Sequence, residues 1–130
     1  MILVDSSAWI EFQRATGSGP DRRLTGALAE DEPLATTGIV LMEVLAGARD
    51  ERQAGDLRRL LGRCRLLGLE EPSDPELAAS LYRACRREGE TVRRLPDCLI
   101  AAVAIRHDAS VLHADADFDV LARHTPLRIA

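Results

Sequence analysis

Five acidic residues, drawn from four separate parts of the chain, have the side chains that a metal-dependent phosphodiesterase needs. They are Asp5, Glu43, Asp97, Asp115 and Asp117. Two carboxylates about 4 Å apart repel each other by roughly 4 kcal/mol at an effective dielectric constant near 20, so a cluster of them requires a cation. Ligation by oxygen alone selects hard ions, and we therefore predict Mg²⁺, with Mn²⁺ as a substitute. One or two such ions can activate water for attack on a phosphodiester.

Asp5 and the Asp115/Asp117 pair follow the same local pattern. Asp5 comes directly after the aliphatic segment 2–4, and the pair comes just after a similar segment, 110–113. Short continuous aliphatic segments are typical of strands in a buried parallel sheet, whose carboxyl ends border the ligand crevice. We expect these acids at that edge of the sheet. For Asp5 alone, capping of the following helix is the alternative.

Glu43 and Asp97 each belong to a strongly apolar helical segment. Every neighbour of Glu43 from Ile39 to Leu45 is aliphatic, so the sequence predicts an embedded glutamate whose charge needs a partner. A metal ion is the favoured partner, and an arginine salt bridge is the alternative. Asp97 follows Pro96 in the first turn of a helix predicted through Ile105, where the helix dipole favours negative charge. The apolar character of that helix predicts that Asp97 faces an interior crevice.

The elements that must position these residues alternate between strands and helices. Parallel strands need crossover connections, so this alternation predicts an α/β fold with a mostly parallel sheet covered by helices. The predicted strands are 2–4, 34–36, 65–69, 110–113 and 127–129, and the predicted helices are 6–14, 21–30, 39–46, 50–63, 75–88 and 95–105. A length of 130 residues predicts one domain, spanning 1–130.

Composition limits the class of protein. Hydrophobic residues make up 46% of the chain, which predicts a packed core, and the longest apolar run, 99–105, is too short to span a membrane. The three cysteines are predicted to be reduced thiols, and with no export signal we expect a cytoplasmic protein without membrane contact. The net charge of −4 argues against a protein that coats nucleic acid non-specifically, but it allows an acidic site with a basic rim.

The sequence resembles the PIN-domain ribonucleases, in particular the VapC toxins of bacterial toxin-antitoxin pairs. The resemblance spans essentially the whole chain and rests on the order and spacing of several short motifs. These are Val4-Asp5-Ser6-Ser7-Ala8-Trp9-Ile10, Met42-Glu43, the segment 89–102 with Leu95-Pro96-Asp97, and His113-Ala114-Asp115-Ala116-Asp117-Phe118.

The resemblance implies a three-layer α/β sandwich and Mg²⁺-dependent cleavage of cellular RNA, tRNA or rRNA. It also implies homodimerisation and inhibition by a cognate VapB-type antitoxin, as in a type II system. By position, Asp5 and Asp97 resemble the principal metal ligands, and Glu43 with Asp115 or Asp117 completes the pocket. Ser6 stands where many relatives have threonine, and its hydroxyl is expected to orient Asp5 or a water on the metal.

A basic rim completes the predicted site. Its arginines are expected to hold RNA phosphates, and they are Arg86, Arg87, Arg93 and Arg94. A solvated charged face is the alternative interpretation of these residues. Three other functions remain open, namely a non-catalytic PIN-like module that binds RNA or protein, a metal-dependent nuclease acting on DNA, and a metal-free ribonuclease using His107, His113 or His124.

Overall fold

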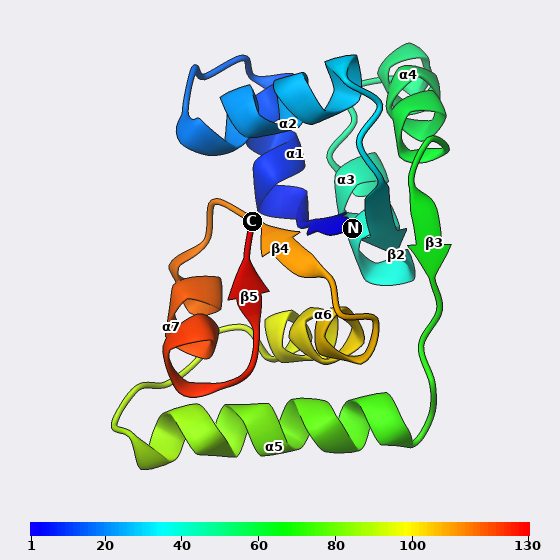
Figure 1. The fold of residues 1–130 in the computed structure, drawn as a ribbon. Coiled ribbons are helices and arrows are strands. Elements are labelled where there is room, and N and C mark those ends of the chain that lie inside the picture. Colours follow the sequence, from blue (N-terminus) through cyan, green and yellow to red (C-terminus); the bar gives the residue numbers. More distant parts are fainter.

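A computed structural model of the chain describes all 130 residues and has one five-stranded sheet, with the strands in the order β3-β2-β1-β4-β5 (Figure 1). Each neighbouring pair is parallel. The strands are β1 (Ile2–Val4), β2 (Leu34–Thr37), β3 (Arg65–Leu67), β4 (Ser110–Leu112) and β5 (Arg128–Ile129). The helices are α1 (Ser6–Gln13), α2 (Gly19–Ala29), α3 (Gly38–Ala46), α4 (Glu51–Leu61), α5 (Ser73–Arg87), α6 (Leu95–Arg106) and α7 (Ala116–His124).

The strand order divides the helices into two layers. The chain moves from β1 to β2 and β3 in one direction and then returns over the sheet to β4 and β5. Because crossovers between parallel strands are right-handed, α1 to α4 cover one face and α5 to α7 cover the other. The contacts agree, since α1 packs on α2 and α3, α3 packs on α4, and α5, α6 and α7 pack on one another (Figure 1). The predicted three-layer α/β sandwich is confirmed.

This topology singles out the carboxyl ends of β1 and β4. The direction of strand succession reverses between β1 and its neighbour β4, so the connections that leave these two strands go to opposite faces of the sheet. In open α/β sheets the crevice that binds ligands lies at the carboxyl ends of strands at such a point. The residues that follow β1 and β4 are therefore the first candidates for a site.

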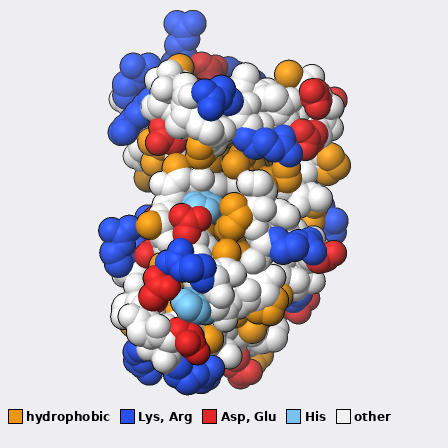
Figure 2. Space-filling model, turned by 60° about the vertical axis from the view of Figure 1, so that its left-hand side comes forward, with side chains coloured by type: hydrophobic (Ala, Val, Ile, Leu, Met, Phe, Trp, Pro, Cys, Tyr) orange, Lys and Arg blue, Asp and Glu red, His pale blue; other side chains and the backbone are white.

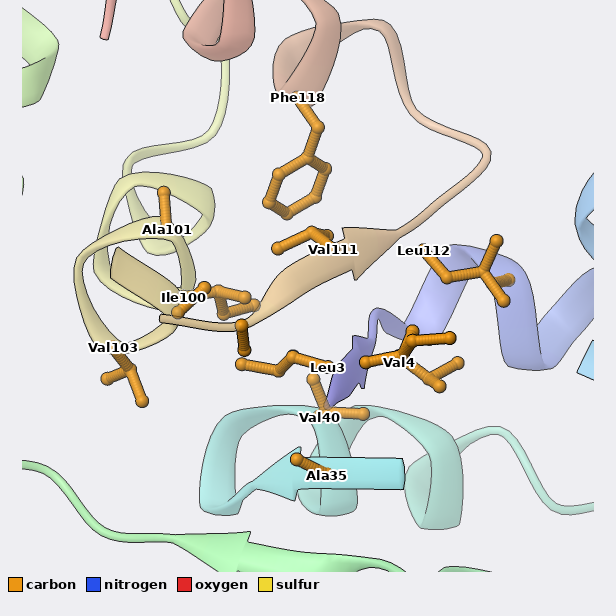
Figure 3. Close-up of a cluster of buried hydrophobic side chains, with 14 of the residues drawn as sticks. Leu3, Val4, Ala35, Val40, Ile100, Ala101, Val103, Val111, Leu112 and Phe118 are labelled. Carbon is orange, nitrogen blue, oxygen red and sulfur yellow. The ribbon is translucent and has the colours of Figure 1, made fainter. Parts of the chain in front are cut away.

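The core lies on both faces of the central strands. Leu3 and Val4 of β1 and Val111 of β4 are fully buried, as continuous aliphatic strands in a covered parallel sheet must be. Figure 3 shows them packed between Val40 of α3 on one side and Phe118 of α7 on the other. Helix α6 is apolar on every face because it lies between the sheet and α5 (Figure 1). The ends of β1, β4 and α6 are thereby held in fixed positions.

The predicted strands and helices are all present, with ends that differ from the expectation by a few residues. One helix, α7, is not in the sequence-based prediction, because its first turn carries Asp117 and Asp119 and its apolar stripe is short. Asp115 provides the N-cap of this helix by accepting a hydrogen bond from the Asp117 amide. None of the seven helices combines the length and the hydropathy that crossing a membrane would require.

Candidate active site

Asp5 is buried at the end of β1, in the crevice beside β4. Its amide donates to the Leu112 carbonyl at 2.9 Å, which fixes it against the neighbouring strand. Its Oδ2 accepts from the Ser7 amide at 3.0 Å and from the Ser7 hydroxyl at 2.6 Å, whereas its Oδ1 is buried without a hydrogen-bond partner. Both functions proposed from the sequence thus coexist, because one oxygen caps α1 and the other is available for a ligand.

The hydroxyl that orients Asp5 belongs to Ser7. Ser6 is buried, but its side chain makes no hydrogen bond to Asp5, so the sequence-based choice of Ser6 for this contact differs from the geometry. Ser7 Oγ also accepts from the Ala114 amide at 2.9 Å and so joins the ends of β1 and β4. The sequence contained a signal for Ser7, since the second residue after an aspartate N-cap is where a capping contact forms.

Three further aspartates form a compact cluster. One carboxylate oxygen each from Asp97, Asp115 and Asp117 lies within 4.8 Å of the others. Asp97 is 2% exposed, in the first turn of α6, and its Oδ2 is buried without a partner. Burial, together with the charges of Asp5 and Asp115 and a hydrogen bond with Asp117, raises the pKa of Asp97 to about 8. The cluster therefore carries more negative charge than its own surroundings neutralise.

Asp115 and Asp117 differ in how their oxygens are used. Asp117 is buried, and its two oxygens accept the backbone amides of Arg93 at 3.1 Å and Arg94 at 3.0 Å. Burial opposes ionisation, but these hydrogen bonds outweigh it and lower the pKa of Asp117. Asp115 accepts only through Oδ1, from the Asp117 amide and from the Arg93 guanidinium, and its Oδ2 has no partner. Asp117 thus holds the loop before α6 in place, and Asp115 retains a free oxygen.

Glu43 lies at the edge of the cluster and is less buried than its sequence predicts. Its side chain is 23% exposed, and the neighbouring Met42 is 63% exposed, because α3 turns an apolar face to the surface and is not enclosed on all sides. The expectation of an embedded glutamate is therefore wrong. The alternative of an arginine partner is observed, since Glu43 Oε2 accepts from Arg94 at 2.6 Å. The charge of Glu43 still acts on the site. Burial is the main cause that raises the pKa of Asp5, and the charge of Glu43 raises it further.

The donor set fits a hard divalent cation. Two buried carboxylate oxygens without partners, Asp5 Oδ1 and Asp97 Oδ2, accompany the free oxygen of Asp115. An unpartnered buried carboxylate oxygen is costly, and a cation at the three-aspartate cluster would supply the partner that Asp97 Oδ2 lacks. Asp5 lies outside this group of three, but its charge raises the pKa of Asp97, so it faces the same site. No histidine or cysteine belongs to the cluster, which disfavours zinc. The residues present thus suit Mg²⁺ or Mn²⁺.

The predicted basic rim is only partly assembled. Arg93 contacts Asp115 and Asp117, and it shares with Arg83 and Arg86 a groove of about 420 Å³ between α5 and the loop before α6, called here the Arg93 groove. Tyr82 also lines it, with the Arg86 guanidinium 5.6 Å from the ring centre. Arg87 is exposed and lines no part of this groove. The structure therefore adds Tyr82 and Arg83, which sequence reasoning missed because only packing shows which helix faces share a groove.

Comparisons with known proteins give matches over nearly the whole chain. The PIN domain family model matches residues 2–124. The chain is 47% identical to "Ribonuclease VapC11" of Mycobacterium tuberculosis over 131 aligned positions, which cover 100% of this chain and 98% of that protein. This chain belongs to the VapC group of the PIN-domain family.

Solved VapC-type structures share the fold. The DNA-bound VapBC of Salmonella typhimurium superposes with a TM-score of 0.75 at 18% identity, covering 99% of this chain and 96% of that one. Mycobacterium tuberculosis VapC20, a Sarcin-Ricin loop cleaving toxin, superposes with a TM-score of 0.64 at 21% identity. The match covers 92% of this chain and 93% of VapC20. At these identities the likeness supports the VapC fold alone.

Proposed function

We propose that this VapC protein is a Mg²⁺-dependent endoribonuclease and the toxin of a type II toxin-antitoxin system, acting on tRNA or rRNA. The observation that carries the proposal is the compact cluster of Asp97, Asp115 and Asp117, in which Asp97 Oδ2 is buried without a partner. The unpartnered Asp5 Oδ1 adds a second such oxygen, on a residue whose charge acts on Asp97. We also propose that residues 1–130 form a single PIN domain, since all elements share one sheet and one core.

The residues divide the work of the site. Asp5, Asp97 and Asp115 would hold the ion, and Glu43 would join them or hold Arg94 in place. Asp117 keeps the loop before α6 in place through the amides of Arg93 and Arg94. A bound divalent ion supplies positive charge to the scissile phosphate and activates water for attack. This division assigns to Asp115 the ligand position that the sequence left open between Asp115 and Asp117.

RNA is favoured as substrate by the arginines beside the cluster. Figure 2 shows acidic and basic side chains interspersed over one face of the molecule, which has no broad basic surface of the kind that coats duplexes. The Arg93 groove instead combines three guanidinium groups with the face of Tyr82, which suits phosphates and one stacked base of a single strand. Ribonucleases 47% identical over the full chain support the same substrate class.

A cleavage assay with purified protein tests the activity. We expect RNA to be cleaved with Mg²⁺ or Mn²⁺, cleavage to stop with EDTA and return with excess Mg²⁺, and the products to carry 5′-phosphates. A DNA strand of the same sequence is the control, and its equal cleavage would favour a DNA nuclease. Cleavage that survives EDTA and leaves cyclic phosphates would overturn the proposal in favour of the histidines. No cleavage with any divalent ion would favour a binding module.

The histidine mechanism is disfavoured by where the histidines lie. His124 contacts Glu90 and His107 contacts Arg106, so neither is directed at the acidic cluster. His113 alone borders the cluster, and its Nδ1 accepts the Asp115 amide at 3.1 Å while Nε2 faces Asp119. A pair of histidines that could share acid and base work is not assembled.

The proposed partners are a VapB-type antitoxin and a second copy of the chain. The fold is shared with toxins solved in VapBC complexes, and large apolar side chains are exposed on neighbouring parts of α3, β3 and α6. They include Met42, Leu66 and Leu95, each more than half exposed. We expect a dimer by light scattering, and a monomer after Met42→Glu with Leu95→Glu. Expression of the chain should arrest growth, and co-expression of a short open reading frame from immediately upstream should relieve the arrest. A cytoplasmic location follows from the RNA substrate and the free cysteines.

A further inference from the structure

A second groove is lined by Glu43 and shares no residue with the Arg93 groove. It has a volume of about 480 Å³ and is lined by the end of α1, by α3 and the segment after it, and by the start of α4. We call it the Glu43 groove. Its elements all belong to the α1–α4 layer, whereas the Arg93 groove belongs to α5 and the loop before α6 in the other layer. The Glu43 groove adjoins the site through Glu43, which pairs with Arg94, and the Arg93 groove adjoins it through Arg93, which contacts Asp115 and Asp117. The two grooves therefore border the site from different layers.

The lining of the Glu43 groove is polar and basic. Arg14 and Arg49 face it, and neither forms an ion pair or a side-chain hydrogen bond, although Arg23, Arg63 and Arg106 elsewhere each hold a carboxylate. The one acid in the lining, Glu43, is already paired with Arg94. The groove therefore has two positive charges available for anionic groups.

Two glutamines supply the hydrogen-bonding groups. Gln13 and Gln53 line the groove, and Gln53 Oε1 accepts the Arg49 amide at 2.7 Å, so its amide nitrogen is directed elsewhere. A glutamine side chain pairs with the edge of an unpaired base as donor and acceptor together. Only Ile10 and Val44 are hydrophobic in this lining, which offers little to an apolar peptide segment.

From these contacts, the geometry points to the Glu43 groove as the binding site for the RNA strand on the far side of the scissile phosphate from the Arg93 groove. Arg14 and Arg49 hold phosphates there, and Gln13 and Gln53 contact base edges. A single strand then crosses the molecule from one layer to the other over the carboxylates. This inference rests on the proposed ribonuclease function, and it adds the residues that choose the cleavage site.

The test compares two double variants on one RNA substrate. Arg14→Ala with Arg49→Ala removes both charges from the groove. Arg58→Ala with Arg65→Ala removes two exposed arginines that also lack ion pairs but line neither groove. Exposed arginines without partners contribute little to stability, so both variants should melt within about 2 °C of the parent.

We expect the groove variant to raise KM about 10-fold or more while kcat changes less than 2-fold. The slope of log binding against log salt should fall by about 1 to 1.5, because each phosphate contact on a single strand contributes about 0.7. Footprinting should lose protection on one side of the cleavage site only. Gln13→Leu should shift the cleavage-site preference. The control variant should match the parent in all four measurements.

The outcomes separate this inference from the proposed function. If the parent does not cleave RNA at all, the proposed function fails. If the parent cleaves and the groove variant keeps its KM, salt slope and footprint, the function stands and the Glu43 groove is not an RNA site. If the groove variant instead cleaves normally but no longer binds the co-expressed antitoxin, the groove belongs to a peptide and the inference is overturned.

Discussion

One buried aspartate lies at each end of helix α6, and the two differ in whether the chain neutralises their charge. Asp97 lies in the first turn, 2% exposed, with one oxygen lacking any partner. Asp74, 1% exposed at the start of α5, meets the last residue of α6, Arg106, whose Nε and Nη2 donate to it at 2.9 and 2.8 Å. Asp74 also accepts the Glu70 amide at 2.8 Å.

The same burial therefore has opposite electrostatic results. The hydrogen bonds from Arg106 outweigh burial and lower the pKa of Asp74, whereas burial and neighbouring carboxylates raise the pKa of Asp97 to about 8. Asp74 is a charge that Arg106 neutralises within the chain, so removing either member of this buried pair would leave the other without a partner. Asp97 is a carboxyl group whose negative charge, when ionised, no group of the chain neutralises. In this protein a carboxylate without compensation, and not a buried one as such, marks the candidate site.

The largest effect should follow from Asp97→Asn. The amide keeps the shape and removes a ligand charge, so RNA cleavage should fall by roughly 10³-fold or more. The fold should survive, and in EDTA the variant should melt several degrees higher than the parent, because an amide neither repels the neighbouring carboxylates nor has to bind a proton to avoid that repulsion. Cleavage rates and thermal melts in EDTA measure both. Full activity in this variant would contradict the metal site.

Asp74→Ala should give the reverse pattern. Removing one member of a buried ion pair costs about 3 kcal/mol, so urea unfolding should shift strongly while the folded fraction keeps its specific activity. Replacing both partners, Asp74→Leu with Arg106→Met, should recover much of the loss because no buried charge then lacks a partner. A stable Asp74→Ala protein that has lost cleavage would mean that both ends of α6 serve the site.

Ser7→Ala tests the contact that joins the ends of β1 and β4. Removing its hydroxyl takes away one of the two hydrogen bonds that hold Asp5 Oδ2 and leaves the Ala114 amide without an acceptor, so Mg²⁺ affinity should fall roughly 10-fold to 100-fold. Ser6→Ala is the matched control and should change metal affinity less. Isothermal titration with Mn²⁺ measures both variants. Equal losses in the two would return the positioning role to Ser6.

A further difference should appear in the pH dependence of stability. The pKa of Asp97 rises from 3.8 to about 8 on folding, so the native state binds the extra proton and stability in EDTA should decline as pH rises between about 4 and 8. The lowered pKa of Asp74 has the opposite sign, and its contribution is present above about 4 and lost in acid. Urea unfolding of the parent and of Asp97→Asn at pH 5, 6, 7 and 8 should show the flatter profile in the variant. Parallel profiles would refute this assignment.

The sequence predicted correctly those features that depend on residues close together in the chain. Aliphatic triplets predicted β1 and β4, and the acids that follow them had to lie at one edge of a parallel sheet. It failed where the result depends on packing between distant segments. The exposure of Glu43, the groove that Tyr82 shares with Arg93, and the pairing of Asp74 with Arg106 all depend on how separate segments pack, and the sequence does not specify which of their sides face each other.

The sequence by itself determined the five acids, the alternation of strands and helices, and with these the α/β class and the edge of the sheet at which a cation would bind. Tertiary structure decided which carboxylates keep a free oxygen. Asp115 retains one, whereas Asp117 uses both of its own on the amides of the loop before α6, and both oxygens of Asp74 accept from Arg106. The physical reason is that a hydrogen bond or an ion pair depends on distances of a few tenths of an ångström between segments, which composition and spacing leave undetermined.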